Sequence, residues 1–517
     1  MIHLVELILS PEQCTTDELL KQSFARHLKI DTEQITGFEL QKKSIDARNR
    51  NVKFRFVASI TVDEPYAPKP FQYDLKNVTN GMPVHIIGFG PAGIFAALKL
   101  ITHGYKPIIF ERGKDVKSRR RDLAEINRHL IINPDSNYCF GEGGAGTYSD
   151  GKLYTRSNKR GNLHEILQLF VMHGAQPDIL FEAHPHIGTN KLPQIVTSMR
   201  KSIEDCGGEV HFNSKLTDIE TSFDEVKTIT INDTLKISTN KLILATGHSA
   251  RDIFELLHRK NIFIESKSLA IGVRVEHPQQ IIDEAQYQCK RRPDYLPPAS
   301  YSLVTQVDQT GVFSFCMCPG GIIAPAATAP GEVVVNGWSP SKRNGLFANS
   351  GLVVSINEKE LQKYDSFGPL ASLHYQKKIE SDSFMAANHS IQAPAQRIND
   401  FLNNRYSSTL PANSYIPGLT SANLHHVLPP EISNKLKIAL HNFSNKIKGY
   451  HSSEAIMVAT ESRTSSPVRI TRNNLTLQHV QIKGLYPCGE GAGYAGGIVS
   501  AGMDGQRVAD AIANAPQ

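Results

Sequence analysis

A chain of 517 residues is long enough for about three folding units of roughly 150 residues each. The composition, 40% hydrophobic and 21% charged, excludes a fibrous or wholly disordered chain. A net charge of +6, from 56 Lys and Arg against 50 Asp and Glu, is too small to predict a nucleic-acid or membrane partner. Seven Cys and no basic, apolar leader predict a cytoplasmic protein without a signal peptide.

The first 64 residues predict a small separate module. Alternating or periodic apolar residues indicate a strand at 3–10, a helix at 16–27 and two strands at 38–45 and 52–62. This order is β-α-β-β. The Pro-containing stretch that follows, residues 65–80, is predicted to be an extended linker.

The most informative segment begins with an apolar strand at 83–87. It continues into Gly88-x-Gly90-x-x-Gly93, an apolar helix at 94–103 and a second strand that ends at Glu111. This context completes the fingerprint of a dinucleotide-binding βαβ unit. Gly88 allows the tight turn, Gly90 lets the backbone approach a pyrophosphate, and Gly93 lets the helix pack on its strand.

Glu111 indicates which dinucleotide is bound. A carboxylate at this strand end accepts hydrogen bonds from the two ribose hydroxyls of an adenosine and repels a 2′-phosphate. The site is therefore expected to suit FAD or NAD rather than NADP.

The remaining predicted elements lie on either side of a less regular, Pro-rich middle. They are short strands from 209 to 237, a strand at 241–247, helical stretches near 393–404 and 430–448, a strand at 485–488 and a helix at about 498–513. Two further G-x-G-x-x-G matches, at 141–146 and 491–496, lack the βαβ context. Both are expected to bring backbone close to the ligand bound at Gly88.

Several long motifs resemble one family. They are the Gly88 turn with Glu111 and Arg112, and the runs 140–153, 316–321, 463–469 and 484–498. Together they resemble the uncharacterised bacterial FAD-dependent dehydrogenases, or NAD(P)/FAD-dependent oxidoreductases. The resemblance covers nearly the whole chain and implies a two-domain flavoprotein fold related to fumarate-reductase-like and geranylgeranyl-reductase-like proteins.

This resemblance implies an α/β fold in which an FAD-binding, Rossmann-like domain is split in sequence. The expected division is module 1–64, linker 65–80, FAD-binding domain 81–250 and 465–517, and a mixed α/β substrate-side domain at 251–464. The residues it implies for FAD binding are Gly88, Gly90, Pro91, Ala92, Gly93, Glu111, Arg112, Gly143, Gly144, Ala145, Gly146, Thr147, Leu216, Thr246, Gly247, Gly489, Glu490, Gly497 and Ile498.

The predicted reaction is hydride transfer between flavin N5 and an organic small-molecule substrate, with NADH or NADPH as a transient electron donor. Asp150 or Lys152 would adjust protonation near the flavin ring. Arg463 would either clamp a substrate carboxylate or join the domains structurally. No metal site is predicted.

Other polar motifs leave alternatives open. Only one residue separates Cys316 from Cys318, whereas the usual redox pair has two between its cysteines. Two small buried residues of a strand are therefore preferred over thiols that face the flavin. His184 and His186 are either loop histidines or a proton donor near the flavin. The basic run from Lys114 to Arg121 is expected to be a solvated helix face.

The N-terminal module allows a second class of function. Its hairpin carries six basic residues, Lys42, Lys43, Arg48, Arg50, Lys53 and Arg55. They are the one feature that favours an RNA-associated, tRNA-modification-type flavoprotein. Without interleaved exposed aromatic residues, a packing or homodimerisation module is preferred. A flavin-binding protein without turnover and a reductase of lipid-like substrates are further alternatives.

Overall fold

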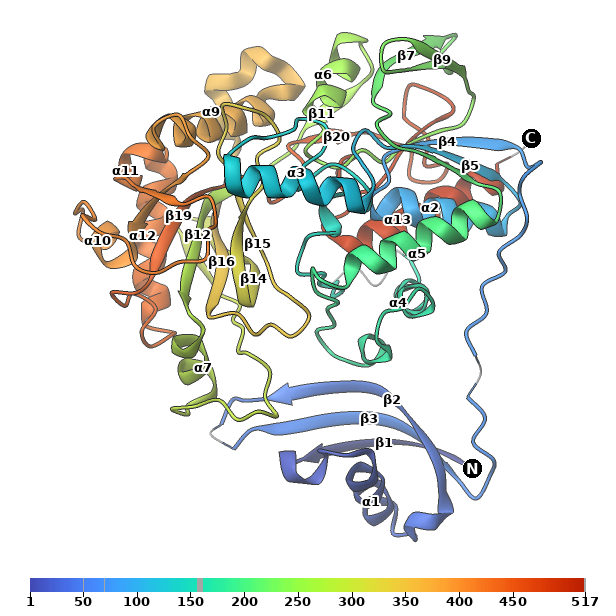
Figure 1. Ribbon diagram of the computed structural model, residues 1–517, viewed down its shortest axis with the longest axis vertical. Helices are drawn as coiled ribbons and strands as arrows, with labels where there is room; N and C mark the ends of the chain where they lie inside the picture. Colours follow the sequence, from blue (N-terminus) through green and yellow to red (C-terminus); the bar gives the residue numbers. More distant parts are fainter. Residues whose placement is uncertain (50, 69, 156–160, 516–517) are drawn as a thin grey trace.

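The structure is a computed structural model that describes residues 1–49, 51–68, 70–155 and 161–515. It is a mixed α/β protein with several sheets (Figure 1). Among these residues, none of the helices is both long and apolar enough to cross a membrane.

The N-terminal module is a three-stranded antiparallel sheet covered by one helix. Its elements are β1 (Ile2–Leu9), α1 (Asp17–Leu28), β2 (Ile35–Asp46) and β3 (Lys53–Val62), in the sheet order β1-β3-β2. The Thr16 hydroxyl caps α1 by accepting a hydrogen bond from the Leu19 N–H. Phe24 of α1 is fully buried, so the helix covers one face of the sheet as the sequence predicts.

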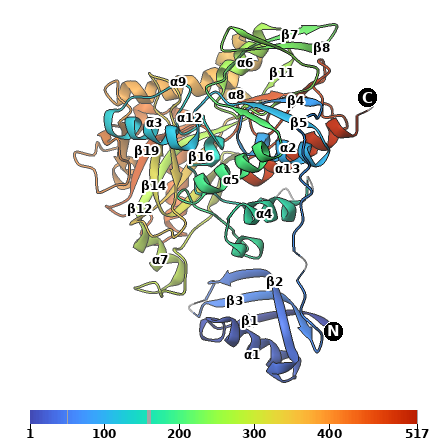
Figure 2. The same cartoon turned by 45° about the vertical axis from the view of Figure 1, so that its right-hand side comes forward.

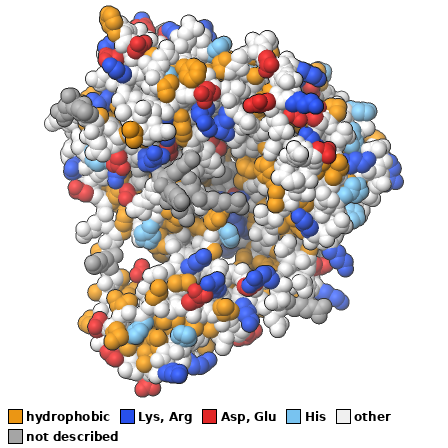
Figure 3. Space-filling model, turned by 180° about the vertical axis from the view of Figure 1, so that it is seen from behind, with side chains coloured by type: hydrophobic (Ala, Val, Ile, Leu, Met, Phe, Trp, Pro, Cys, Tyr) orange, Lys and Arg blue, Asp and Glu red, His pale blue; other side chains and the backbone are white. Residues whose placement is uncertain are grey.

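The module lies at one end of the molecule in both ribbon views, with the segment after β3 running alongside (Figures 1 and 2). The backbone of Lys43 in β2 exchanges hydrogen bonds with Phe181 and Ala183, and the Lys43 ammonium lies 2.8 Å from Glu182. Hydrophobic side chains gather on the module's outer surface (Figure 3), where β1 exposes Ile2, Leu4 and Ile8.

A five-stranded parallel sheet, in the order β21-β10-β4-β5-β6, forms the second part. Its strands are β4 (Pro83–Ile87), β5 (Lys106–Phe110), β6 (Glu209–His211), β10 (Leu242–Leu244) and β21 (Leu485–Pro487). The helices of this part are α2 (Pro91–Thr102), α3 (Val116–His129), α4 (Leu163–Met172), α5 (Leu192–Asp205) and α13 (Ile498–Ala513). A three-stranded antiparallel sheet adjoins it, made of β7 (Leu216–Ser222), β8 (Glu225–Ile231) and β9 (Leu235–Ser238).

An eight-stranded sheet dominates the third part, and all but one of its neighbouring strand pairs are antiparallel. Its strands are β12 (Ala270–Pro278), β13 (Val304–Val307), β14 (Thr310–Pro325), β15 (Val335–Trp338), β16 (Phe347–Ser355), β17 (Ala393–Arg397), β18 (Leu419–Ser421) and β19 (Ile456–Glu461). The helices around it are α7 (Gln279–Tyr287), α8 (Glu358–Leu361), α9 (Ala371–Ala386), α10 (Ile398–Leu402), α11 (Leu424–Val427) and α12 (Pro430–Ser444), while α6 (Arg251–Arg259) lies beside β7. A small ribbon of β11 (Ile264–Ser266) and β20 (Val468–Ile470) lies outside this sheet.

One sequence prediction in this part was wrong. The stretch near 393–404, predicted to be helical, begins as β17 and becomes helical only in α10. The strand forms because it pairs with β18 and β19, a tertiary interaction that local sequence does not report.

The two ends of the parallel-sheet part meet where α13 packs on α2. A Cβ atom at Gly505 of α13 would overlap with the carbonyl oxygen of Ala92 in α2. The two helices are therefore in backbone contact, which only glycine permits at this position.

Replacing Gly505 by Ala should therefore destabilise the protein, although Gly→Ala inside a helix ordinarily stabilises by about 1 kcal/mol. We expect a net loss of about 1–3 kcal/mol in the free energy of unfolding, measured with urea, because the helices must separate. Gly496→Ala, with no heavy atom within 4 Å of the added Cβ, is the matched control. A Gly505→Ala protein as stable as the wild type would contradict the close contact.

Candidate functional site

The first glycine turn joins β4 to α2. A Cβ at Gly88, whose φ is +101°, would overlap with the Ala245 carbonyl and lie 3.2 Å from the Thr246 Cα. A Cβ at Gly93 would overlap with the carbonyl of Gly88. Gly90 is the N-cap of α2 and Pro91 its first residue. The backbone N–H groups of the first helical turn, which have no partner within the helix, therefore lie at the glycine turn.

The Glu111 carboxylate fixes the position of this turn. It accepts hydrogen bonds from the backbone N–H groups of Phe89, Gly113 and Gly141, each at 2.9 Å, and the residue is 5% exposed. A carboxylate offers about four acceptor positions, so capacity remains for one further donor. Glu111 thus joins the β4–α2 turn to the beginning of the second glycine-rich loop.

The second loop, residues 141–147, lies against the first turn. The Gly143 N–H donates to the Phe89 carbonyl at 2.8 Å, and a Cβ at Gly144 would lie 3.2 Å from the Gly90 Cα. The Thr147 hydroxyl, which is buried, donates to the Glu142 carbonyl, while Ala145 is exposed at the tip.

A buried arginine supports this loop from inside. Arg119 of α3 is 0% exposed and donates to the carbonyl oxygens of Asn137, Glu142 and Gly144 at 2.8–2.9 Å. The prediction that the whole basic run 114–121 is solvated was therefore wrong for Arg119. Its position shows why, because it shares the buried face of α3 with Leu123 and Ile126 at helical spacing.

The third glycine-rich turn runs from β21 to α13. A Cβ at Gly489 would lie 2.7 Å from that of Ala92, and one at Gly491 would overlap with the backbone of Gly247. Glu490 is close to His248, with 3.3 Å between Oε1 and Nδ1.

A buried ion pair holds this third turn. Asp504 of α13 accepts from the Gly489 N–H at 2.8 Å and forms a bidentate pair with Arg472 at 2.6 and 2.9 Å. Sequence reasoning missed both residues, although Asp504 shares the buried face of α13 with Ala501 and Val508.

The three glycine segments converge on one place. A Cβ at Gly146 would lie 3.4 Å from side-chain atoms of both Pro91 and Ile498, the first residues of α2 and α13. Gly497 is the N-cap of α13. The structure thus brings together predicted site residues from the first, second and third segments.

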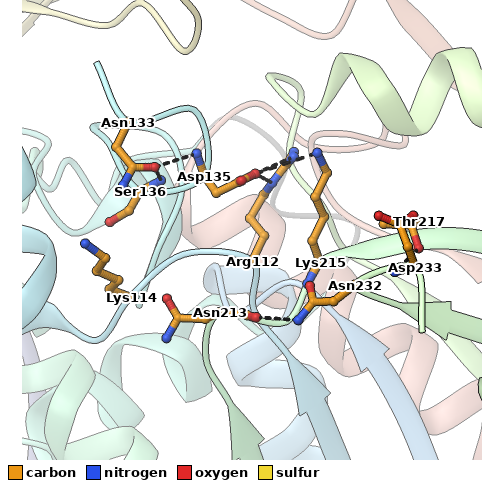
Figure 4. Close-up of a pocket in the computed structure, with 10 residues that line it drawn as sticks. All are labelled: Arg112, Lys114, Asn133, Asp135, Ser136, Asn213, Lys215, Thr217, Asn232 and Asp233. Carbon is orange, nitrogen blue, oxygen red and sulfur yellow. Dashed lines mark hydrogen bonds and ion pairs between the residues drawn. The ribbon is translucent and has the colours of Figure 1, made fainter. Parts of the chain in front are cut away.

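A polar cavity of about 470 Å³ opens at Arg112, the residue that follows Glu111 (Figure 4). It is lined by Arg112, Lys114, Asn133, Asp135, Ser136, Asn213, Lys215, Thr217, Asn232 and Asp233. Arg112 is fixed by ion pairs of 2.9 Å to Asp135 and Asp252 and lies over the Phe140 ring. Leu216 is buried in β7, so its backbone, between Lys215 and Thr217, is the part nearest the cavity.

The predicted catalytic pair Asp150 and Lys152 lies in a charged cluster. The Asp150 carboxylate, 2% exposed, is 3.2 Å from the Lys152 ammonium and 2.7 Å from the Arg343 guanidinium. Burial alone would raise the pKa of Asp150, but Lys152 and Arg343 outweigh it and lower the pKa below its usual range. Burial likewise opposes the charge on Lys152, yet Cys316, Cys318 and Asp150 raise its pKa above its usual range. Both groups therefore stay ionised around neutral pH.

Arg463 lies in a different environment. Its guanidinium donates to Glu332, Glu380 and Thr328, and Arg251 binds the same two carboxylates. All of these residues are buried. Because the donors of Arg463 are already bound within the protein, these contacts favour a structural role for Arg463 over a role as a substrate clamp.

The remaining candidates are placed as follows. The His186 Nε2–H donates a hydrogen bond to the Ser341 carbonyl at 3.0 Å, and His184 packs against Tyr154. In the module, Lys43 pairs with Glu182, Arg48 with Asp46 and Arg55 with Glu6. Arg50 lies outside the described residues. In the part of the chain that the structure describes, no group of three or more His, Cys, Asp or Glu is arranged to hold a metal ion.

Comparison with known proteins decides the family. An uncharacterized protein of Clostridium beijerinckii is 38% identical over 515 residues, which is 96% of this chain and 95% of the relative. The chain belongs to the same family as this protein. Residues 268–464 match a family model described as FAD-dependent protein, C-terminal domain-like. Residues 1–61 match a domain of unknown function, DUF8436.

The C-terminal match supports an FAD-dependent protein and leaves the dehydrogenase assignment as a proposal. Among solved structures, the chain is 11% identical to CtdE in complex with FAD, over 84% of each chain, with a TM-score of 0.32. It is 13% identical to the flavin-dependent brominase Bmp2, over 83% of this chain and 78% of that one, with a TM-score of 0.35. Similarity this low carries no argument about reaction or substrate.

Replacing Arg119 by Met tests the support of the second loop. Three buried carbonyl oxygens would lose their donor, at a cost of about 1–3 kcal/mol for each one left unsatisfied. We expect lower stability in urea and faster proteolysis between residues 137 and 147. Arg121→Met, on the exposed face of the same helix, should behave like the wild type. Equal behaviour of the two variants would contradict a supporting role for Arg119.

Proposed function

We propose that the protein is an FAD-dependent oxidoreductase that binds FAD where the three glycine segments converge. The main support for this site is that Gly90, Gly144, Gly146 and the first residue of α13 lie together at the N-terminus of α2. Backbone that approaches this closely at a helix N-terminus is the arrangement that pyrophosphate binding requires. The match of residues 268–464 to an FAD-dependent family model supports the same cofactor.

The residues present fit FAD. The free N–H groups of α2 and its dipole would hold the pyrophosphate. Glu111 keeps acceptor capacity for a ribose hydroxyl, and the cavity at Arg112 would take the adenosine. The Gly143–Thr147 loop and the N-terminus of α13, with Glu490 beside it, would contact the ribitol and flavin side.

FAD, when bound, supplies hydride exchange at its N5 atom with an organic substrate. Around the reaction, Lys152 presents a fixed positive charge, because Asp150 and the two cysteine sulfurs keep it protonated. Asp150, itself bound by Arg343, orients that ammonium. Lys152 would therefore bind a substrate oxygen that becomes negative, rather than release its own proton. Arg463 has no substrate role in this proposal.

Gly90→Ala separates ligand binding from folding. In the protein alone, the added Cβ would lie 3.9 Å from the Gly144 Cα, an ordinary contact, so the fold should persist. With FAD bound, the methyl group would occupy the close approach to the pyrophosphate, so retained FAD per chain should fall at least tenfold. The readout is the flavin absorbance of purified protein, with circular dichroism to confirm folding. A folded Gly90→Ala protein with stoichiometric flavin would contradict the site.

Reduction by nicotinamides tests the enzyme class. Under anaerobic conditions, NADH or NADPH should bleach the visible flavin band if a nicotinamide is the electron donor. Lys152→Met should leave the oxidised spectrum unchanged but slow turnover with a substrate that accepts the hydride, because the positive charge is lost. A flavin that neither nucleotide reduces would instead indicate reduction by the substrate itself. Absence of flavin after addition of FAD would disprove the proposal.

A further inference from the structure

Two cysteines of β14 lie on the Lys152 ammonium. The Lys152 Nζ is 3.4 Å from the Cys318 sulfur and 3.7 Å from the Cys316 sulfur. Cys316 is exposed, whereas Cys318 is fully buried. Both thiols therefore contact one cation, and only the first is open to a reagent from solution.

A β-bulge produces this arrangement. Phe315 pairs with Gly351 and Cys318 pairs with Asn349, so three steps along β14 oppose two along β16. Cys316, within the bulge, has a φ of +48°, a conformation that non-glycine residues seldom adopt. Such strain is commonly found at functional positions.

The charges around the pair favour a thiolate at Cys316. The Cys318 side chain lowers the pKa of Cys316, and the nearby Lys152 and Arg274 cations lower it further. Burial raises the pKa of Cys318, which therefore keeps its proton, and its thiol donates to the Cys316 carbonyl oxygen at 3.2 Å. The other charged or titratable groups around the pair are Asp150, Glu461, Arg343 and His186.

We propose that Cys316 and Cys318 form a thiol–disulfide exchange site for low-molecular-weight disulfides, with Lys152 holding the Cys316 thiolate. An exposed nucleophilic sulfur beside a buried second thiol and a cation is the arrangement such exchange requires. No step uses FAD, although the proposal shares Lys152 with the proposed flavin reaction, so labelling of the cysteines tests it separately from flavin binding. The proposal also revises the preference for Cys316 as a small buried residue.

The reaction takes place in two displacements. The Cys316 thiolate attacks one sulfur of the disulfide RSSR, and the S–S bond breaks. RS⁻ departs, and a mixed disulfide between Cys316 and the other R group remains. The Cys318 sulfur then attacks the Cys316 sulfur, and the second R group leaves as RSH with the Cys318 proton. The substrate is reduced to two thiols, while the cysteine pair is oxidised to one disulfide.

Brief alkylation of the full-length protein with iodoacetamide tests the thiolate. At pH 6 an ordinary thiol is less than about 1% ionised. We expect Cys316 to be labelled at least tenfold faster than Cys289, the internal reference, in peptides read by mass spectrometry. Lys152→Met should slow labelling of Cys316 at pH 6 about tenfold and leave Cys289 unchanged. Equal rates for Cys316 and Cys289 in the wild type would overturn the proposal without need of any variant.

Oxidised glutathione tests the exchange. The wild type should gain an internal Cys316–Cys318 disulfide and release two glutathione thiols. Cys318→Ser should stop at one glutathionyl group on Cys316, and Cys316→Ser should take up none at Cys318. Cys289→Ser is the matched control and should react like the wild type. A wild type that keeps glutathione on Cys316, or that does not react, would overturn the proposal.

Discussion

Buried charges that bind backbone groups hold the candidate site together. The Glu111 carboxylate binds three N–H groups, one in each of the first two glycine segments and one at Gly113. The Arg119 guanidinium binds three carbonyl oxygens, two of them in the second segment and one just before it. Glycine-rich backbone has little side-chain packing and loses much conformational entropy on folding. Hydrogen bonds to charged groups, worth about 1.5–3 kcal/mol each, supply order that packing cannot. The close meeting of the three glycine segments depends on them.

The same device recurs at the third turn. Asp504 binds the Gly489 N–H, and Arg472, paired with Asp504, binds the Pro487 carbonyl, so this ion pair holds the third turn. The polar side chains of this region are thus directed at the protein's own backbone, and the cavity at Arg112 is left for a ligand. By contrast, the cluster of Asp150, Lys152 and Arg343 directs its charges at one another and at two sulfurs. The proposed cofactor site and the proposed catalytic residues are therefore surrounded by separate groups of charges.

Sequence patterns predicted the unit β4–α2–β5 and the N-terminal module well, because their glycine spacing and apolar alternation are local signals. The eight-stranded sheet had weaker signals. β19 is buried along its whole length and begins with four apolar residues in a row, so its residues do not alternate in polarity. β12 does alternate, with Ile271, Val273 and Val275 between more polar or smaller residues, but it lies in the less regular, Pro-rich middle of the sequence. Arg119 and Asp504 could have been found from helical spacing alone, whereas the approach of Lys152 to Cys316 and Cys318 joins residues too distant in sequence for any pattern to report.

The place of β21 in the parallel sheet bears on how the protein is made. β21 and α13 are synthesised after the whole of the eight-stranded sheet, yet they complete a sheet whose other four strands come earlier. During translation, the apolar face of α2 that α13 covers has no partner until these last segments emerge. The N-terminal module and the large sheet can reach their folded state first. Molecular chaperones would therefore find their main target in the half-finished parallel sheet, and a ribosome that stalled late would release a chain unable to retain a dinucleotide.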